Sequence, residues 1–284
     1  MNVTEYLQKW SVSYRDDMLG NIMPFWLKHG LDLRNGGVYT CLDRDGSLID
    51  TTKSVWFQGR FAFTCSYAYN HIEQNPEWLA AAKSTIDFIE QHCFDSDGRM
   101  FFEVTASGEP LRKRRYVFSE TFAAIAMAEY AIASGEREYA EKALKLFKDI
   151  QRFLNTPGVL EPKYWNTVQS KGHSIVMILI NTASRIRAAI ADPALDKQID
   201  DSIALLQKDF MHPEFNALLE TVGSNGEFID TINGRIINPG HCIETSWFIL
   251  EEAKYRNWDK QLTDMALTIL DWSWEWGWDK EYGG

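Results

Sequence analysis

A turn glycine recurs along this chain at intervals of about 60 residues. Gly46, Gly108 and Gly226 each follow an Asp, Ser or Asn, and each lies beside a short apolar or β-branched segment, which is typical of a hairpin turn. The first two glycines are 62 residues apart, and the third follows after 118, close to two further intervals. A unit of this length holds about two helices and a hairpin. Such a unit cannot bury its own apolar face, so the copies must pack on one another.

Helical periodicity fills the segments between these turns. It predicts nine helices, at residues 4–28, 54–72, 76–92, 119–134, 136–154, 172–191, 195–210, 239–256 and 259–276. Short strands are predicted at residues 36–40, 98–104 and 215–221. The pattern predicts an all-α fold, a toroid or barrel of paired helices with short β-hairpins in the connecting loops. A linear helical solenoid is the alternative, although its units are usually shorter. Because no Pro- or Ser-rich linker interrupts the pattern, a single domain is predicted over residues 1–284.

The C-terminal residues repeat a signal that occurs near the start of the chain. Residues 278–284 carry the same change from helix to hairpin as residues 34–37, and each segment ends in a Gly-Gly pair. Nine helices also leave the fifth pair half made. We therefore expect a toroid that is incomplete at its C-terminal end.

Composition excludes several classes of function. The chain is 45% hydrophobic and 24% charged, as expected of a soluble globular protein. Its net charge of −11 argues against nucleic acid or an anionic membrane as a partner. A bilayer-spanning segment and a signal-like N-terminus are both missing, so a cytoplasmic protein is expected. The four cysteines lack metal-site spacing, and nucleotide-loop and serine-hydrolase motifs are missing too, so neither a metal nor a cofactor is predicted.

The segment from Asn238 to Trp247 combines a helix start with a histidine and a carboxylate. Asn238 is a good N-cap and Pro239 suits the first helical position. Glu244 lies three residues after His241 on the same helical face, so it can accept a hydrogen bond from the imidazole and fix its tautomer. The positive end of the helix disfavours a charged imidazole. The pattern predicts a neutral, oriented base, and the alternative is a histidine that only caps the helix.

Three further segments carry candidate residues. Arg60 follows Trp56 and Phe57, and an arginine among aromatic side chains needs either an oxygen-rich ligand or a structural salt bridge. Glu120 falls in the first turn of a helix, where it either faces the centre of the toroid or only supports the helix. His173 opens another helix, and a lone histidine of this kind is more often a cap or a core residue than a catalyst.

Taken together, these segments resemble the N-acylglucosamine 2-epimerase family, also known as renin-binding proteins. The resemblance runs along nearly the whole chain and rests on residues 39–46, 55–60, 118–120, 238–247, 277–279 and 283–284. It implies an (α/α)6 barrel of twelve helices, of which the last three would be lacking here. It also implies the interconversion of N-acetylglucosamine and N-acetylmannosamine by inversion at carbon 2, which needs a base, donors to an enediolate and an acid on the opposite face.

The resemblance further implies roles for individual residues. His241 matches one of two catalytic histidines, with the other expected in a C-terminal part that these residues do not include. Glu244 matches a carboxylate beside that histidine, and Arg60 matches an arginine that contacts the reacting oxygens. Further substrate-binding candidates are Tyr39, Trp56, Phe118, Glu120, His173 and Met177. A homodimer is expected, no cofactor is required, and ATP is an activator in the mammalian branch.

Other functions remain open at this point. Cellobiose 2-epimerases, mannose-type 2-epimerases and aldose–ketose isomerases share the barrel. The cellobiose epimerases and aldose–ketose isomerases tend to carry a histidine at the position of Met177 and a tyrosine near Phe118, and both differences favour an acylamino sugar. A toroidal glycoside hydrolase or lyase would need two inward carboxylates, for which Glu120 and Glu244 are the candidates. A non-catalytic scaffold that binds a sugar or a protein is the third alternative.

Overall fold

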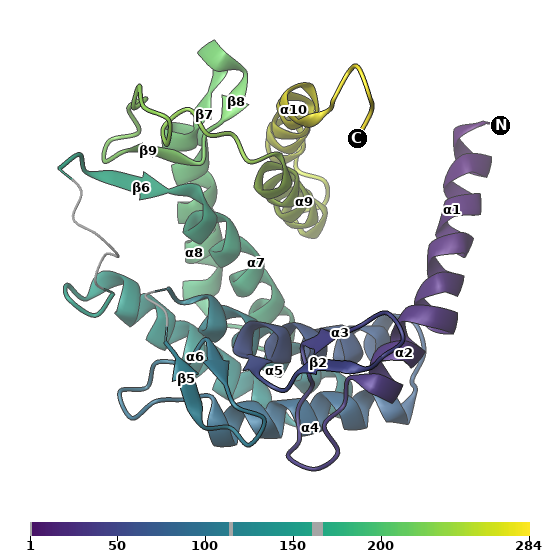
Figure 1. The fold of residues 1–284 in the computed structure, drawn as a ribbon. Coiled ribbons are helices and arrows are strands. Elements are labelled where there is room, and N and C mark those ends of the chain that lie inside the picture. The colour runs from purple at the N-terminus through teal and green to yellow at the C-terminus, as the bar shows by residue number, and fades with distance from the viewer. Residues whose placement is uncertain (1, 114–115, 161–166) are drawn as a thin grey trace. The chain divides into compact units, whose positions relative to one another are not determined.

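A computed structural model describes residues 2–113, 116–160 and 167–284 of the chain. The contacts within it divide into two compact units, residues 1–161 (unit 1) and residues 162–284 (unit 2). Both units are built from helical hairpins with short strands in the connections (Figure 1). Among the described residues, none of the helices combines the length and the apolar character that crossing a bilayer requires.

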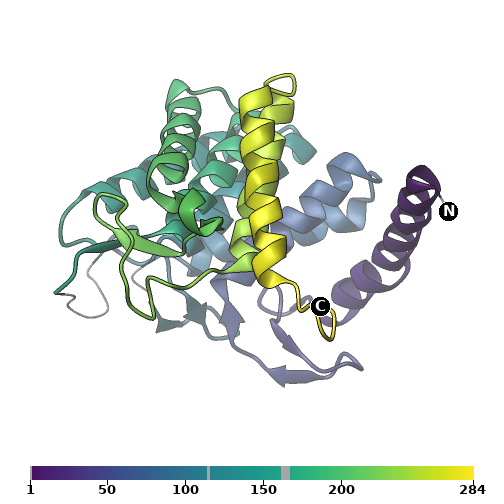
Figure 2. The same ribbon diagram turned by 90° about the horizontal axis from the view of Figure 1, so that it is seen from above.

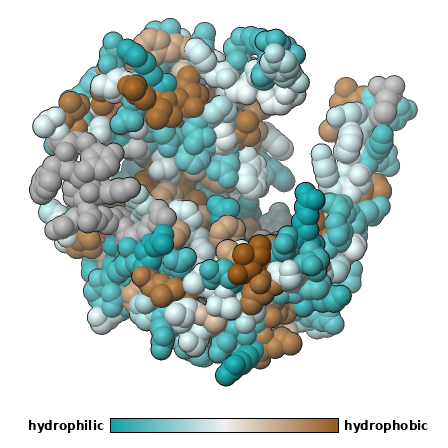
Figure 3. Space-filling model, in the orientation of Figure 1, coloured by the Kyte–Doolittle hydropathy of each residue, from teal (hydrophilic) through white to brown (hydrophobic). Residues whose placement is uncertain are grey.

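Unit 1 opens with a continuous helical segment. It runs through α1 (Val3–Asp17), a π-helical turn, η1 (Met18–Ile22), and α2 (Met23–His29). Asn2 and Glu5 form a capping box at its start. The single helix predicted over residues 4–28 is therefore interrupted by the π-helical turn. No residue of α1 is buried, whereas α2 buries Met23; Figure 3 shows apolar side chains among hydrophilic ones along α1.

Two helical hairpins follow in unit 1. They consist of α3 (Val55–His71) with α4 (Pro76–His92), and α5 (Phe118–Ser134) with α6 (Arg137–Asn155). The helix α3 packs on α5, while α4 and α6 pack on α3 and α5 respectively, which gives two layers (Figure 1). Every residue from Ser119 to Ala131 is buried, as expected of a helix covered on all sides. The outer helix α6 is amphipathic and buries one face only.

Unit 2 repeats this arrangement. It contains α7 (His173–Ala189), α8 (Pro193–Leu205) with a terminal π turn, η2 (Leu206–Phe210), α9 (Pro239–Tyr255) and α10 (Lys260–Gly277). The helices α7 and α9 pack on each other, α8 packs on α7, and α10 lies along α9 (Figure 2). The nine predicted helices are thus confirmed with small shifts at their ends, apart from the two π turns.

The strands are shorter than predicted. In unit 1, β1 (Cys41–Leu42) pairs with β2 (Leu48–Asp50), and β4 (Glu103–Val104) pairs with β3 (Lys53–Ser54) and β5 (Pro110–Arg112). In unit 2, β6 (Ser170–Gly172) pairs with β9 (Thr221–Gly223), and β7 (Met211–His212) pairs with β8 (Ala217–Leu218), with a 3-10 turn, η3 (Pro213–Phe215), between β7 and β8. All these pairs are antiparallel. The strand predicted at 36–40 was wrong, because two glycines with positive φ turn the chain there.

The repeat inferred from the turn glycines is visible in atomic detail. Gly46 and Gly108 have φ of 85° and 92°, and each packs on the histidine that ends the preceding helix. A Cβ on Gly46 would lie 2.3 Å from Cγ of His29, and one on Gly108 would lie 2.2 Å from Cγ of His92. The third turn glycine, in unit 2, packs in the same way on Asp209. The helix end and the turn therefore form one recurring structural unit.

Candidate active site

The start of α9 is built as the sequence predicts. The side chain of Asn238 caps the helix by accepting a hydrogen bond from the backbone N–H of His241, at 3.3 Å. Pro239 occupies the first helical position. His241 therefore lies in the first turn, and its side chain is 35% exposed. Such a position leaves one edge of the imidazole open to a ligand.

The carboxylate that binds the His241 ring is Glu220. The Nδ1 atom of His241 lies 3.1 and 3.0 Å from the two carboxylate oxygens of Glu220. The hydrogen bond predicted from His241 to Glu244 was wrong, because a helical side chain leans toward the helix N-terminus and carries His241 toward the β8–β9 connection. Glu244, one turn on, acts on His241 through its charge, which adds to the effect of Glu220 in raising the pKa of His241.

Strand pairing places a second histidine beside Glu220. Gly172 of β6 stands opposite Thr221 of β9, and the next pair continues the register, with the backbone N–H of His173 donating to the carbonyl of Glu220 at 3.0 Å. The Nδ1 atom of His173 then lies 3.6 Å from Oε2 of Glu220. One carboxylate therefore lies between two imidazole rings.

The protonation of His173 follows from Thr245. The Thr245 hydroxyl donates its only hydrogen to the carbonyl of His241, at 2.8 Å. It can then only accept from Nε2 of His173, which lies 2.8 Å away. Nε2 of His173 therefore carries a proton, and Nδ1 is the ring nitrogen that faces Glu220.

The interactions within the cluster change the pKa values of both Glu220 and His241. Burial raises the pKa of Glu220, but its interactions with His173 and His241 outweigh burial and lower that pKa to about 2. The hydrogen bond with Glu220 raises the pKa of His241 by more than burial lowers it. Glu220 is thus a carboxylate at neutral pH, and it favours the protonated form of His241. In the neutral form, which His241 takes up above its raised pKa, Glu220 holds the remaining proton on Nδ1. The Nε2 lone pair of His241 is then free to accept a proton.

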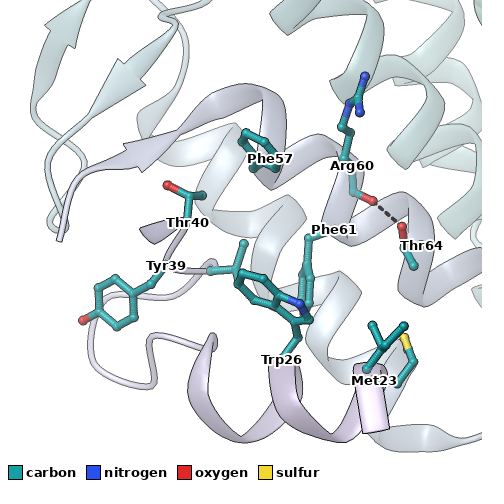
Figure 4. A pocket seen from close by; sticks show the side chains of 10 residues that line it. Met23, Trp26, Tyr39, Thr40, Phe57, Arg60, Phe61 and Thr64 are labelled. Atoms are coloured by element: carbon teal, nitrogen blue, oxygen red, sulfur yellow. Dashed lines mark hydrogen bonds between the residues drawn. The ribbon is translucent and has the colours of Figure 1, made fainter. Parts of the chain in front are cut away.

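Arg60 lies in unit 1, near the start of α3, and is exposed. Its guanidinium carbon lies 4.4 Å from the ring centroid of Phe122, and among the described residues no carboxylate forms an ion pair with it. Figure 4 shows the Arg60 side chain extending away from Trp26 and Met23. A cavity of about 390 Å³ adjoins it, lined by Ile22, Met23, Trp26, Val38, Tyr39, Thr40, Phe57, Arg60, Phe61 and Thr64. The structural salt bridge considered for Arg60 is not observed.

Two other candidates of unit 1 form an aromatic cluster. The ring of Trp56 lies 5.3 Å from that of Phe118 and 5.2 Å from that of Phe102. Tyr39 is apart from them, in the cavity beside Arg60, with the ammonium of Lys53 5.3 Å from its ring. The half-buried faces of Trp56 and Phe118 are suited to packing against the apolar face of a sugar.

Glu120, Met177 and His173 are buried. Glu120 is fully buried, and its Oε1 accepts hydrogen bonds from Nε of Arg99 at 2.8 Å and from the backbone N–H of Met100 at 2.9 Å. It ties α5 to the preceding hairpin, and a carboxylate held in this way is a poor acid catalyst, which weakens the hydrolase alternative. Met177 is 4% exposed and His173 is 0% exposed, so both contribute to the core of unit 2.

Sequence reasoning missed Glu220 and Thr245. Glu220 ends the short apolar run 217–219, where a carboxylate directly after buried strand residues is a signal in its own right. Thr245 lies one turn after His241, a spacing that places both side chains on one helical face. Among the described residues, His173, Glu220 and His241 are also the group whose donor atoms converge closely enough to consider a metal ion.

Solved structures of sugar epimerases share this fold. The cellobiose 2-epimerase of Bacillus thermoamylovorans B4167 matches with a TM-score of 0.83 and 21% identity, covering 95% of this chain and 73% of that one. A D-mannose isomerase matches with a TM-score of 0.77 and 18% identity, covering 92% and 70%. These likenesses, with the helical hairpins of both units, define the class of protein as an (α/α)6 barrel.

Sequence comparison identifies the family. The profile of the N-acylglucosamine 2-epimerase family matches residues 37–284. The N-acylglucosamine 2-epimerase of Bos taurus is 30% identical over 94% of this chain, and that of Homo sapiens is 28% identical over 99% of it. The chain belongs to the N-acylglucosamine 2-epimerase family. It spans 65% of the length of the bovine protein and 67% of the human one.

Proposed function

We propose that the protein is a sugar 2-epimerase that interconverts N-acetylglucosamine and N-acetylmannosamine. The observation that carries this proposal is the His241–Glu220 pair, which presents an imidazole oriented by a carboxylate at the start of α9. Membership of the family supports the reaction class, and the curated relatives with 28–30% identity carry the name of this activity.

The proposed reaction proceeds on the open-chain sugar, in which the aldehyde acidifies the C2 proton. Nε2 of His241 removes that proton, and the electron pair of the C–H bond passes into the enediolate. The resulting imidazolium keeps its Nδ1–H on Glu220, whose negative charge stabilises it. A proton returned to C2 from the opposite face completes the inversion. Arg60, without a carboxylate partner among the described residues, is our candidate for binding a substrate oxygen.

Glu220 is a positioning residue in this scheme. It does not act on the sugar, but it fixes the tautomer of His241 and offsets the charge that His241 gains. His173 and Thr245 in turn hold Glu220 and α9 in register. Because His173 is fully buried, we do not propose it as the second proton donor.

A 2-epimerase acting on cellobiose or mannose, or an aldose–ketose isomerase, is the second candidate. It is favoured by relatives named cellobiose 2-epimerase, which are 24% and 26% identical to this chain. The two candidates share the base, and the epimerases among them differ in the substituent at C2 of their substrates. A parallel assay of N-acetylmannosamine, mannose and cellobiose therefore separates them.

The test is formation of the epimer by the full chain, followed by proton NMR. We expect N-acetylmannosamine to yield N-acetylglucosamine, and His241→Asn to abolish this while the circular dichroism spectrum is retained. His71→Asn, which changes an exposed histidine of unit 1, should keep the wild-type rate. Turnover of cellobiose or mannose alone would move the assignment to the second candidate. Sugar binding without turnover of any of the three would support a non-catalytic scaffold and reject both.

The remaining properties are proposed from the family resemblance. We propose a cytoplasmic homodimer that needs no cofactor and in which ATP acts, if at all, as an activator. The net charge of −11 is compatible with a highly soluble protein. Light scattering at several protein concentrations, with and without ATP, measures the assembly.

A further inference from the structure

Three potential metal ligands converge beside the base of the proposed reaction. One donor atom from each of His173, Glu220 and His241 lies within 4.8 Å of the other two. The three residues come from different elements, the start of α7, the β8–β9 connection and the start of α9. Their positions are fixed by the register of β6 on β9 and by the Asn238 cap, so the convergence does not depend on a flexible loop.

The ring of His173 provides a second, independent indication of a ligand at this place. Its Nδ1 atom is buried and has no hydrogen-bond partner among the residues that the structure describes. The Thr245 hydroxyl accepts a hydrogen bond from Nε2 of His173, so that Nδ1 is the ring nitrogen that faces the Glu220 carboxylate, 3.6 Å away. A buried ring nitrogen that lacks a hydrogen-bond partner and faces a carboxylate is a position that a cation can fill.

We propose that His173, Glu220 and His241 form a reversible site for a divalent transition-metal ion of the Zn²⁺ class. Two imidazoles and one carboxylate are a common ligand set for zinc, with an open fourth position for water. Mg²⁺ and Ca²⁺ prefer oxygen ligands and are disfavoured by two nitrogens.

Metal binding requires the three donor atoms to move closer together. Zinc–ligand bonds of about 2.0–2.2 Å require donor atoms closer together than 4.8 Å. His173 is rigid because it is buried, whereas the side chains of Glu220 and His241 are 20% and 35% exposed and can move toward it. The exposed edge of His241 leaves space for the fourth ligand.

Occupation of this site would inhibit the epimerase, a consequence that rests on the proposed function. In the base form, His241 holds its proton on Nδ1 and has its lone pair on Nε2. A metal ion bound at Nδ1 uses the lone pair of that nitrogen, so the single proton of the neutral ring moves from Nδ1 to Nε2 through solvent. The ring then has no free lone pair with which to remove the C2 proton.

The binding test uses the metal alone. Chelator-treated full chain is titrated with Co²⁺, whose visible absorption reports a nitrogen- and oxygen-ligated site, and Zn²⁺ is then added as a competitor. We expect one ion per chain, displaced by Zn²⁺. Glu220→Gln and His173→Gln should each weaken binding by about 100-fold or more, since removing a direct ligand exceeds the 10–100-fold effect of removing an outer partner. His71→Gln, beside Glu129 in unit 1, should bind as the wild type does.

Several outcomes would overturn the site. One is a failure of the wild-type chain to bind one Co²⁺ ion, and another is Co²⁺ binding that Glu220→Gln and His173→Gln both retain. If His173→Gln does not fold, Glu220→Gln carries the test, because its side chain is partly exposed. Epimerase activity without Co²⁺ binding rejects the metal site and leaves the proposed function standing. Co²⁺ binding without epimerase activity supports the metal site and rejects the proposed function. Metal binding that leaves epimerase turnover unchanged would contradict the expected inhibition.

Discussion

At the scale of residues, the tautomer of His241 depends on a contact that its own helix does not provide. The cap by Asn238 and the place of Pro239 follow from local sequence, and both were predictable. Glu220 was not, because it lies 21 residues before His241 and reaches it only through strand pairing. Glu244, three residues along the helix, was predicted to bind the His241 ring, but the direction of helical side chains decides which carboxylate is within reach.

The pH dependence of turnover tests the positioning role of Glu220. The Glu220 carboxylate raises the pKa of His241, and below that pKa the imidazole is protonated and cannot act as a base. We expect the acidic limb of kcat/KM to lie above the ordinary imidazole value of about 6.5. In Glu220→Gln the limb should move to lower pH, and the optimal rate should fall roughly 100-fold. The measurement is made with a chelator present. An acidic limb that does not move would reject the role of Glu220.

Thr245 gives a test of the tautomer of His173. Thr245→Val keeps the shape of the side chain and removes the oxygen that accepts from Nε2 of His173, which leaves a buried donor unpaired. We expect a loss of about 1–3 kcal/mol in the free energy of unfolding, measured by urea denaturation. Thr245→Ser, which keeps the hydroxyl, is the matched control and should lose less. Equal stabilities of the two variants would argue against the hydrogen bond.

At the scale of elements, the contact between a helix end and a turn glycine repeats along the chain. The spacing of the glycines was visible in the sequence, but the contact with His29 and His92 was not, since no sequence pattern reports which side chain a turn packs on. The π turns were missed for a related reason. One extra residue in a turn barely alters helical periodicity, yet it rotates the buried face of all that follows.

Alanine substitutions separate the cost of positive φ from the cost of close packing at a turn glycine. Gly46 and Gly98 have φ of 85° and 82°, but only Gly46 packs closely, on His29, while nothing lies within 4 Å of a Cβ built on Gly98. Gly98→Ala should therefore cost only the positive-φ penalty of about 1–2 kcal/mol in the free energy of unfolding. Gly46→Ala should cost more, and the added cost should shrink when His29 is also changed to Ala. Equal costs at both glycines would show that the contact adds nothing.

At the scale of the whole molecule, the fold class was largely predictable and the geometry of the site was not. Nine helical segments followed from local periodicity, and the repeat indicated that they pair. The grouping of His173 with Glu220 and His241 required the register of β6 on β9, a non-local pairing of three residues on each side. Short strands carry little periodicity, so that register could not be inferred from sequence.

The central claim is that His241, oriented by Glu220, removes the C2 proton of an N-acylamino sugar. Its most direct measurement is incorporation of solvent deuterium at C2 of N-acetylmannosamine by the full chain in D2O, followed by NMR. We predict incorporation by the wild type, a rate roughly 100-fold lower for Glu220→Gln, and background exchange for His241→Asn. Exchange at the wild-type rate by the folded His241→Asn variant would contradict the account.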